Sequence, residues 1–209
     1  MEAQRRNRIL IALAVLAVVL FIDLWSKAWV WNEICQFEEK FMRCARPGAN
    51  SRRVEVISGL FYLNFGFNTG AAFSLFRDDG WARTFFIVVT FLALGYMGWL
   101  ALKMPSKRLY GFIAIGMIAG GAIGNLHDRF VRVLKVPWNG KMVERHGVVD
   151  FLQFYYPWNP DEYWPIFNVA DMALVVGVGL LLIYMLRHGE EDVEETESSE
   201  SASAEPSAA

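Results

Sequence analysis

Four long apolar segments constrain the fold of this chain more than any other feature. An α-helix needs roughly 20 mostly apolar residues to cross the hydrocarbon core of a bilayer, and segments of about that length cover residues 9–31, 84–102, 110–126 and 168–186. The chain is 55% hydrophobic and its mean hydropathy is positive, which places it among membrane proteins. The sequence therefore predicts a mainly α membrane protein with four transmembrane helices.

Basic residues near the span ends predict the orientation. Short cytoplasmic segments carry an excess of Lys and Arg, whereas long loops contribute less to this rule. We therefore expect both termini in the cytoplasm and the two long loops, 32–83 and 127–167, outside, although those loops are also basic. The residues on which this orientation rests are Arg5, Arg6, Arg8, Lys103, Lys107, Arg108 and Arg187.

The two ends of the chain differ in composition. The first span follows basic residues, as a cleaved signal peptide does, but it runs into Asp23, Lys27 and three tryptophans rather than a small-residue cleavage site. We expect it to be retained. From Gly189 onward the chain is rich in Glu, Ser and Ala without apolar periodicity, which predicts disorder. The expected organisation is one membrane-embedded domain, 1–188, and a disordered acidic cytoplasmic tail, 189–209.

The outer loops carry their own structure and two cysteines. Segments 54–57 and 60–65 are predicted as short strands around Gly59, and 132–145 as a hairpin or mobile loop. Cys35 and Cys44 are too few for a structural zinc site, and a disulfide and two free thiols both remain open. Lys and Arg form no basic stripe with interleaved aromatics, so nucleic acid is not an expected partner.

Polar residues inside or beside the spans are candidates for function, because they are costly at bilayer depth. Asp23 and Lys27 lie four residues apart on one helix face and can pair in a polar bundle interior; a snorkelling Lys with Asp among the headgroups is the plainer alternative. Gly116, Gly120 and Gly124 form a smooth stripe that predicts close packing of another helix.

Two further clusters lie near the expected outer boundary. Asn125 shares a helix face with Asp128 and Arg129, which favours a site over a solvated helix end. The stretch 68–74 starts with Asn68 and contains Gly70 before small residues, as in a turn that contacts substrate. An ordinary Asn-Gly turn explains that stretch equally simply.

Asp150 and Asp171 are the candidate catalytic pair. Each alone is more often a helix cap or a solvated loop residue, but both are expected at the outer boundary, and Asn168 is placed to orient Asp171. Two close carboxylates share one proton, so one can accept a proton from water while the other protonates a substrate carbonyl. The sequence has no HExxH zinc motif and no evident nucleophile paired with its histidines, which are His127, His146 and His188.

These clusters, in this order, resemble the bacterial lipoprotein signal peptidases, also called signal peptidase II. Five ordered matches over nearly the whole folded chain are specific, whereas any one alone would be weak. The matching residues are Asp23 and Lys27, the stretch 68–73, Asn125 with Asp128 and Arg129, Asp150 in Val-Val-Asp-Phe, and Asn168 with Asp171.

The resemblance implies four transmembrane helices with a small extracytoplasmic β-cradle and loop cap, in the bacterial inner membrane. It implies an intramembrane aspartyl endopeptidase, with Asp150 and Asp171 catalytic and with no metal or organic cofactor. The implied substrate is a diacylglyceryl-modified prolipoprotein, cut just before its lipidated cysteine. We expect a monomer, sensitive to globomycin-type inhibitors. The implied substrate or inhibitor pocket contains Asn68, Gly70, Asn125, Asp128, Arg129 and Asn168, supported by Asp23 and Lys27.

The sequence departs from the family pattern in two segments, and two other functions are compatible with its polar residues. The stretches 32–53 and 129–148 are enlarged relative to the family pattern, which affects the expected shape of the outer cap. A transporter or channel subunit would use Asp23, Asp128 and Asp171 as a proton or cation path, although four spans without an inverted repeat argue against it. An assembly factor would pack through the glycine stripe and use the carboxylates only as caps.

Overall fold

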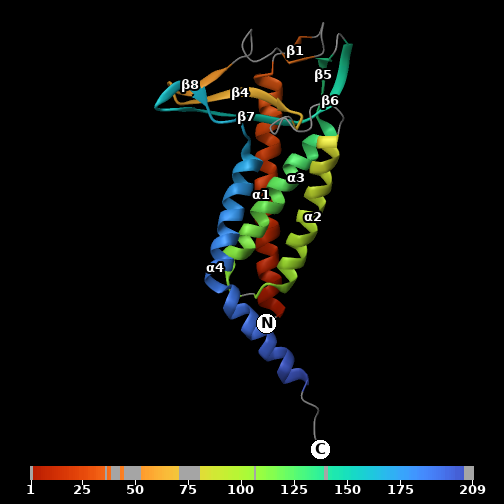
Figure 1. The fold of residues 1–209 in the computed structure, drawn as a ribbon, viewed down its shortest axis with the longest axis vertical. Helices are drawn as coiled ribbons and strands as arrows, with labels where there is room; N and C mark the ends of the chain where they lie inside the picture. The colour runs from red at the N-terminus through yellow and green to blue at the C-terminus, as the bar shows by residue number, and fades with distance from the viewer. Residues whose placement is uncertain are drawn as a thin grey trace, which may run out of the picture.

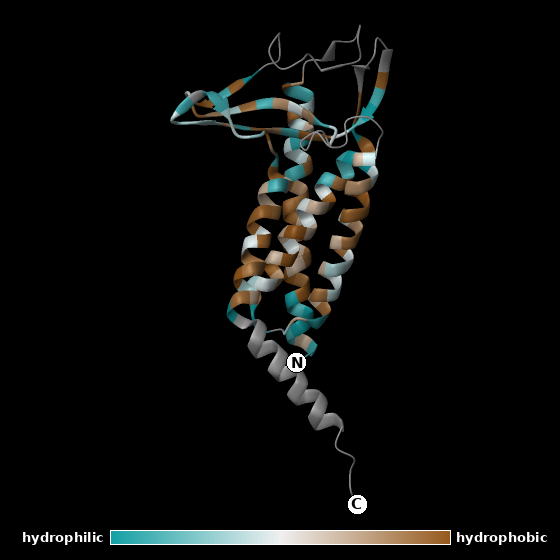
Figure 2. Cartoon of the chain, viewed as in Figure 1, coloured by the Kyte–Doolittle hydropathy of each residue, from teal (hydrophilic) through white to brown (hydrophobic). Residues whose placement is uncertain are grey.

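Four long helices form one bundle in the computed structural model, which describes residues 2–35, 37–38, 43–44, 53–70, 81–105, 107–138 and 141–204. They are α1 (Glu2–Glu33), α2 (Trp81–Lys103), α3 (Leu109–Val131) and α4 (Val169–Ala204), shown in Figure 1. Each contains a stretch long and apolar enough to cross a membrane, so the four predicted spans are confirmed. Figure 2 shows hydrophobic residues along the helices and hydrophilic ones near their ends.

Helix α3 is the central helix of the bundle, with most of its side chains buried between the other helices. Its glycines permit this position. A Cβ on Gly116 would collide with the Ala12 carbonyl of α1, and one on Gly120 would come within 2.9 Å of the Leu16 carbonyl. Gly124 meets α1 in the same way one turn further on. The predicted packing role of the glycine stripe is confirmed, and its partner is α1.

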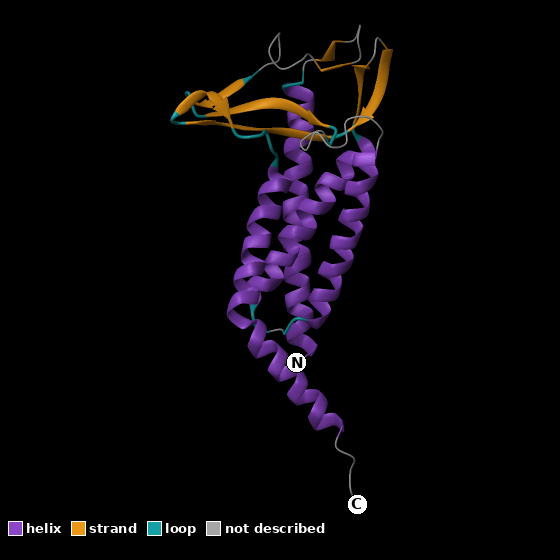
Figure 3. Cartoon of the chain, in the orientation of Figure 1, coloured by secondary structure: helices purple, strands orange, loops and turns teal. Residues whose placement is uncertain are grey.

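A four-stranded antiparallel sheet lies across one end of the bundle, at the ends of the helices remote from the N-terminus (Figures 1 and 3). We call this the sheet end of the bundle. The strand order is β3 (Val54–Ile57), β4 (Phe61–Asn68), β7 (Val148–Tyr156) and β8 (Asn159–Tyr163). The predicted pair of strands around Gly59, whose φ is +71°, is confirmed in β3 and β4.

Two smaller hairpins flank this sheet. The predicted hairpin after α3 is confirmed as β5 (Val133–Trp138) and β6 (Lys141–His146). Strands β1 (Phe37–Glu38) and β2 (Arg43–Cys44) pair in the first long loop, where Cys35 is disulfide-bonded and Cys44, the only other cysteine of the chain, lies opposite Phe37. The first loop is therefore tied to the end of α1.

A second apolar core joins the sheet to the helices. Val30 from the last turn of α1 and Ile34, just after the helix, pack with Phe65 of β4 and with Val149 and Phe151 of β7. All five side chains are buried. This core holds the middle of β7 directly over the bundle, so polar side chains on β7 lie close to the ends of α3 and α4.

Helix α4 continues to Ala204, beyond the predicted span, through the segment for which the sequence predicts disorder. The residues from 189 onward are rich in Glu and Ala, which favour helix, and they extend a helix that is already formed, so no new nucleation is needed. The tail leaves the bundle at the end opposite the sheet (Figure 1).

Candidate functional site

The polar clusters predicted from sequence converge at the junction between the helix bundle and β7. Side chains from the last turns of α1 and α3, from the middle of β7 and from the first turn of α4 form one hydrogen-bonded network. Most of its members are nearly or fully buried from solvent. They are Asp23, Lys27, Asn125, Asp128, Asp150, Asn168 and Asp171.

Asn168 and Asp171 form a capping box at the start of α4. The Asn168 side-chain Oδ1 accepts a 3.1 Å hydrogen bond from the Asp171 backbone N–H, and the Asp171 carboxylate accepts one of 3.1 Å from the Asn168 backbone N–H. Such reciprocal bonds satisfy amides that have no partner within the helix. The Ala170 N–H is satisfied from outside by Asp23 of α1, at 2.9 Å. The helix start therefore determines where the Asp171 carboxylate lies.

Asn168 also holds Asp150. Its Nδ2 donates a 2.7 Å hydrogen bond to Oδ1 of Asp150 on β7. The two candidate catalytic carboxylates are thus bound to one residue, Asp150 through the Asn168 side chain and Asp171 through its backbone N–H. The Asp171 carboxylate also acts electrostatically on Asp150, so the two groups are close enough to influence each other, as a dyad requires.

Asn125 on α3 connects the pair to the bundle interior. Its Nδ2 donates a 2.8 Å hydrogen bond to the Asp171 carboxylate, while its Oδ1 accepts from Asn168 at 3.1 Å and from the Lys27 ammonium at 2.8 Å. Since Asn168 and Lys27 both donate to the Asn125 oxygen, the amide NH₂ of Asn125 is directed at Asp171. The buried amide thereby presents a donor to this carboxylate.

Lys27 is fully buried and is neutralised inside the bundle. Its Nζ lies 2.8 Å from the Asp23 carboxylate and 3.3 Å from the Asp128 carboxylate, both also fully buried. With the 2.8 Å hydrogen bond to Asn125, three oxygens surround the ammonium group. The predicted pairing of Asp23 with Lys27 is confirmed, and a snorkelling Lys27 is excluded.

Asp128 lies apart from the carboxylate pair. Its Oδ2 accepts the Val149 backbone N–H at 3.1 Å. The carboxylate also contacts Lys27, the His127 ring at 3.5 Å and Arg132 at 3.8 Å. The sequence prediction grouped Asp128 with the substrate pocket, whereas the structure buries it beneath β7. Its carboxylate anchors the strand next to Asp150, because it binds the backbone one residue before that aspartate.

Asp150 has an unusual proton affinity for a carboxyl group. Burial, and then the nearby Asp171 carboxylate, raise its pKa from 3.8 to about 7, against the opposing hydrogen bonds from Asn68 and Asn168. Only 4% of the residue is exposed. A pair in which one carboxyl keeps its proton near neutral pH contains both a proton donor and a proton acceptor.

Asn68 reaches Asp150 from the end of β4. Its Oδ1 accepts a 2.9 Å hydrogen bond from the Gly70 N–H, which forms a tight turn, and its side chain bonds Asp150. Gly70 has a φ of +95°, and a Cβ there would come within 2.8 Å of the Ala82 side chain of α2. Both observations require glycine in this turn. The remainder of the predicted stretch, 71–74, lies outside the described residues.

Arg129 is fixed at the sheet end of α3. Its Nη1 donates to the Asn125 carbonyl at 3.0 Å, and its guanidinium lies 4.8 Å from the centre of the Phe86 ring. The Asp150 and Asp171 carboxylates act on it electrostatically. Sequence reasoning missed Arg83, whose Nε donates a 3.0 Å hydrogen bond to the Arg129 carbonyl. A charge at the start of an apolar span was the available signal.

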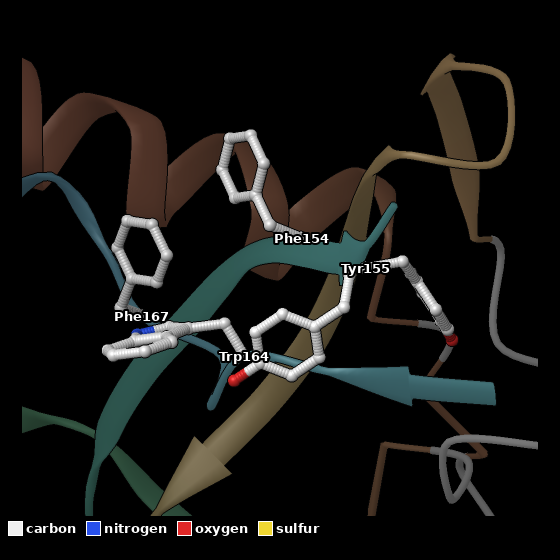
Figure 4. Close-up of a pocket in the computed structure, with 5 residues that line it drawn as sticks. Phe154, Tyr155, Trp164 and Phe167 are labelled. Atoms are coloured by element: carbon white, nitrogen blue, oxygen red, sulfur yellow. The ribbon is translucent and has the colours of Figure 1, made fainter. Parts of the chain in front are cut away.

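An aromatic hollow of about 320 Å³ lies between β7 and the segment that leads into α4. Figure 4 shows Phe154 and Tyr155 from β7 together with Trp164 and Phe167 from the segment that leads into α4. The Phe154 and Phe167 rings stack with centroids 5.9 Å apart. Phe167 immediately precedes Asn168, so the hollow and the polar network are linked through adjacent residues of the chain.

The chemistry that this arrangement supports is general acid–base catalysis by two carboxylates. Among the residues that the structure describes, no group of three or more His, Cys, Asp or Glu side chains is placed to hold a metal ion. The amides of Asn125 and Asn168 orient the two carboxylates, and Arg129 supplies positive charge nearby. Such a pair suits hydrolysis of a peptide bond by an activated water.

Comparisons with known proteins agree with this geometry. The family described as "Signal peptidase (SPase) II" matches residues 15–187. The chain is 38% identical over 147 residues to a lipoprotein signal peptidase of Symbiobacterium thermophilum, covering 70% of this chain and 84% of that protein. It is 34% identical over 171 residues to one of Vibrio vulnificus, covering 78% and 91%.

A solved structure shares the fold. It is a bacterial membrane enzyme determined by the in meso method at 1.9 Å resolution, with a TM-score of 0.61 and 25% identity over 84% of this chain and 92% of that one. The family match spans all four helices and every residue of the polar network. This chain therefore belongs to the signal peptidase II family of bacterial membrane peptidases.

Proposed function

We propose that this protein is an aspartyl endopeptidase that removes signal peptides from diacylglyceryl-modified prolipoproteins. The observation that carries the proposal is the double contact of Asn168, which hydrogen-bonds both Asp150 and Asp171. Family membership supports a peptidase that acts on prolipoproteins. The aspartic mechanism rests on the geometry and proton affinity of the carboxylate pair.

In the proposed mechanism Asp150 holds the shared proton at rest, because burial and its neighbour raise its pKa to about 7. Asp171 takes a proton from a water molecule, whose oxygen attacks the scissile carbonyl carbon, while Asp150 gives its proton to the carbonyl oxygen. The tetrahedral intermediate then loses its C–N bond. The leaving nitrogen takes the proton from Asp171, and the hydroxyl proton returns to Asp150.

The proposed substrate pocket surrounds this pair. Asn68, Gly70, Asn125 and Arg129 line the approach and bind the substrate backbone or a globomycin-type cyclic peptide. The aromatic hollow that contains Phe167 accepts apolar parts of the substrate, because it is lined by rings and Phe167 directly precedes Asn168 in the chain. Cleavage occurs just before the lipidated cysteine, which keeps the lipid in the membrane.

We place the enzyme in the bacterial inner membrane as a monomer, with both termini in the cytoplasm and the active site near the outer face. Basic residues at the end opposite the sheet support this orientation. The disulfide of Cys35 supports it too, because disulfides persist in oxidising compartments. Residues 1–188 form the peptidase domain, and 189–209 are a cytoplasmic tail.

Two substitutions test the proposal. Asp150→Asn and Asp171→Asn each keep the side-chain shape but remove a carboxylate that the reaction requires. We expect both purified, inserted variants to release no signal peptide from a lipidated precursor. Asp161→Asn is the matched control, since Asp161 is an exposed carboxylate on β8 remote from the network.

Retained cleavage by either dyad variant would disprove the carboxylate mechanism. Equal cleavage of lipidated and unlipidated precursor by the wild-type protein would disprove the substrate assignment while leaving the mechanism intact. The two parts of the proposal can therefore fail separately.

A further inference from the structure

An apolar groove runs along the half of the bundle remote from the candidate site. It lies between α1 and α2, with α3 as its floor, and has a volume of about 390 Å³. Leu13 and Leu16 of α1 form one wall, and Leu94 and Gly98 of α2 form the other. The floor is formed by the small residues Gly116 and Ala119 and by two isoleucines, Ile115 and Ile123. Along α2 the groove extends from Leu94 to Leu102, about 12 Å of helix.

A basic hollow adjoins this groove at the N-terminal end of α1. The hollow has a volume of about 360 Å³ and is lined by Glu2, Arg5, Arg6, Ile9 and Leu10. Ile9 lines both the hollow and the groove. Two guanidinium groups and one carboxylate leave the hollow with net positive charge.

The hollow and the groove share one face of α1. Arg5 and Arg6 lie one turn before Ile9, and Ile9 lies one turn before Ala12 and Leu13, so these residues follow each other along the same side of the helix. The face therefore changes from cationic to apolar at the level where α1 begins its apolar stretch. This order matches a phospholipid, whose charged head group continues into an apolar chain.

We propose that the groove and the basic hollow together form a binding site for one anionic phospholipid. Its phosphate lies against Arg5 and Arg6, and one acyl chain lies in the groove between α1 and α2. Guanidinium groups bind phosphate through paired N–H donors, and basic pockets at helix ends recognise anionic head groups. In the proposed orientation of the enzyme, this site faces the cytoplasmic leaflet.

Charge complementarity favours this occupant over other apolar ones. A second copy of the chain or the apolar helix of a signal peptide would fill the groove without using two adjacent arginines. A zwitterionic phospholipid would use the groove but gain less from the net positive hollow. The site is separate from the carboxylate pair, which lies at the sheet end.

Glycine substitutions on α2 test the groove. Gly98→Leu places a side chain in the groove, because a Cβ on Gly98 has open space around it and Gly98 lines the groove. Gly95→Leu is the matched control: it lies one turn away on the same helix, its Cβ position is equally open, and it is not a groove residue. Both changes raise helix propensity equally.

Charge substitutions test the hollow. The double variant Arg5→Gln and Arg6→Gln removes its positive charge, and Arg187→Gln, an exposed arginine at the end of the α4 span, is the control. Because Arg5 and Arg6 are exposed, the double arginine variant should still fold. It therefore tests the proposal even where Gly98→Leu fails to insert.

The measurement is native mass spectrometry of the full chain released from vesicles of equal parts phosphatidylglycerol and phosphatidylcholine. We expect the wild type to retain phosphatidylglycerol about tenfold over phosphatidylcholine, which corresponds to about 1.4 kcal/mol. Gly98→Leu should lose retention of the lipid, and the double arginine variant should lose the preference. Gly95→Leu and Arg187→Gln should behave as wild type.

Three results would overturn the proposal. The first is equal retention of the two lipids by the wild type. The second is identical lipid retention in Gly98→Leu and Gly95→Leu. The third is unchanged lipid retention in Gly98→Leu together with a raised KM for precursor or a lost dimer, which would assign the groove to the signal peptide or to a second copy. Because lipid retention is read without cleavage, it is independent of the proposed peptidase activity.

Discussion

Lys27 and Asn125 are joined by a 2.8 Å hydrogen bond in which the buried ammonium donates to the amide oxygen. Because Asn168 donates to the same oxygen, the Asn125 amide NH₂ is left to bind Asp171. A lysine in the bundle interior, which touches neither candidate catalytic carboxylate in the described network, thereby sets the hydrogen bonding of one of them.

Replacing Lys27 with Met should destabilise the protein strongly. The change leaves Asp23 and Asp128 buried without their common counter-ion, and removal of one partner from a buried ion pair costs about 3–5 kcal/mol. We expect a large fall in the thermal unfolding temperature of the detergent-solubilised protein. Lys103→Met, at the exposed end of α2, is the control and should unfold near the wild-type temperature.

A further variant isolates the charge effect. Adding Asp23→Asn to Lys27→Met removes one of the two uncompensated charges and should recover part of the lost stability. A double variant no more stable than Lys27→Met would show that packing of the lysine stem, rather than charge compensation, explains the loss.

Asn168→Ser should separate the capping role of Asn168 from its role at the carboxylate pair. Serine is a good N-cap residue and retains a bond to the Asp171 N–H, but its short side chain cannot reach Asp150. We expect an unfolding temperature near that of the wild type and a fall in kcat of about 100-fold, the lower range for a lost acid–base contribution. Asn168→Ala should lose both functions, with about 1 kcal/mol of additional destabilisation.

Wild-type kcat in Asn168→Ser would contradict the role of its side chain toward Asp150. Equal unfolding temperatures for the Ser and Ala variants would contradict the capping box. The value of kcat therefore tests the hydrogen bond from Asn168 to Asp150, and the unfolding temperature tests the bond between Asn168 and the Asp171 N–H.

Activity should decline as the pH rises through about 7, where Asp150 loses the proton that the reaction requires. The hydrogen bond from Asn68 favours the ionised form and so lowers the pKa of Asp150. Asn68→Ala removes this bond, which should raise that pKa further and move the alkaline limb of kcat/KM to higher pH. Asn159→Ala is the control, because Asn159 accepts a similar turn bond, from the Asp161 N–H, on the β7–β8 hairpin.

The same proton predicts how stability depends on pH. The pKa of Asp150 is raised in the folded state, so its contribution to stability is fully present below the unfolded pKa and is lost as the pH rises through about 7. Wild type should therefore lose stability relative to Asp150→Asn between about pH 4 and about pH 7. A parallel pH dependence of the two proteins, or an alkaline limb unmoved in Asn68→Ala, would contradict the raised pKa.

Gly124→Ala should destabilise the bundle because its Cβ would collide with the Asp23 carboxylate, which is bound to Lys27 and to the start of α4. Overpacking of this kind costs about 1–3 kcal/mol. Gly98→Ala, where a Cβ meets open space, is the control and should be neutral or slightly stabilising through helix propensity. Equal unfolding temperatures for the two variants would show that α1 shifts to make room.

The spans, the glycine stripe and the strands around Gly59 could be predicted from sequence because each depends on local composition or spacing. Apolar length decides whether a helix can cross a bilayer, and glycine every four residues creates a smooth face wherever that helix lies. The order of polar motifs likewise indicates Asp150 and Asp171 as the candidate pair.

Contacts between remote segments could not be predicted in the same way. Asp23 binds the Ala170 N–H 147 residues away, and Lys27 binds Asn125 98 residues away. Asp128 is buried under β7. An aspartate at the same position near the end of α3 could equally face a pocket, and spacing along the chain cannot distinguish the two cases. The hydrogen bond from Arg83 to Arg129 also exists only because α2 packs on α3.

Composition and spacing are enough to predict a four-span membrane chain with a particular set of polar residues near one end of its spans. Which of these residues share a hydrogen-bonding partner, and which neutralise one another, depends on the tertiary structure. This is because burial and neighbouring charge raise the pKa of Asp150, and both arise when β7 is packed over the ends of α3 and α4.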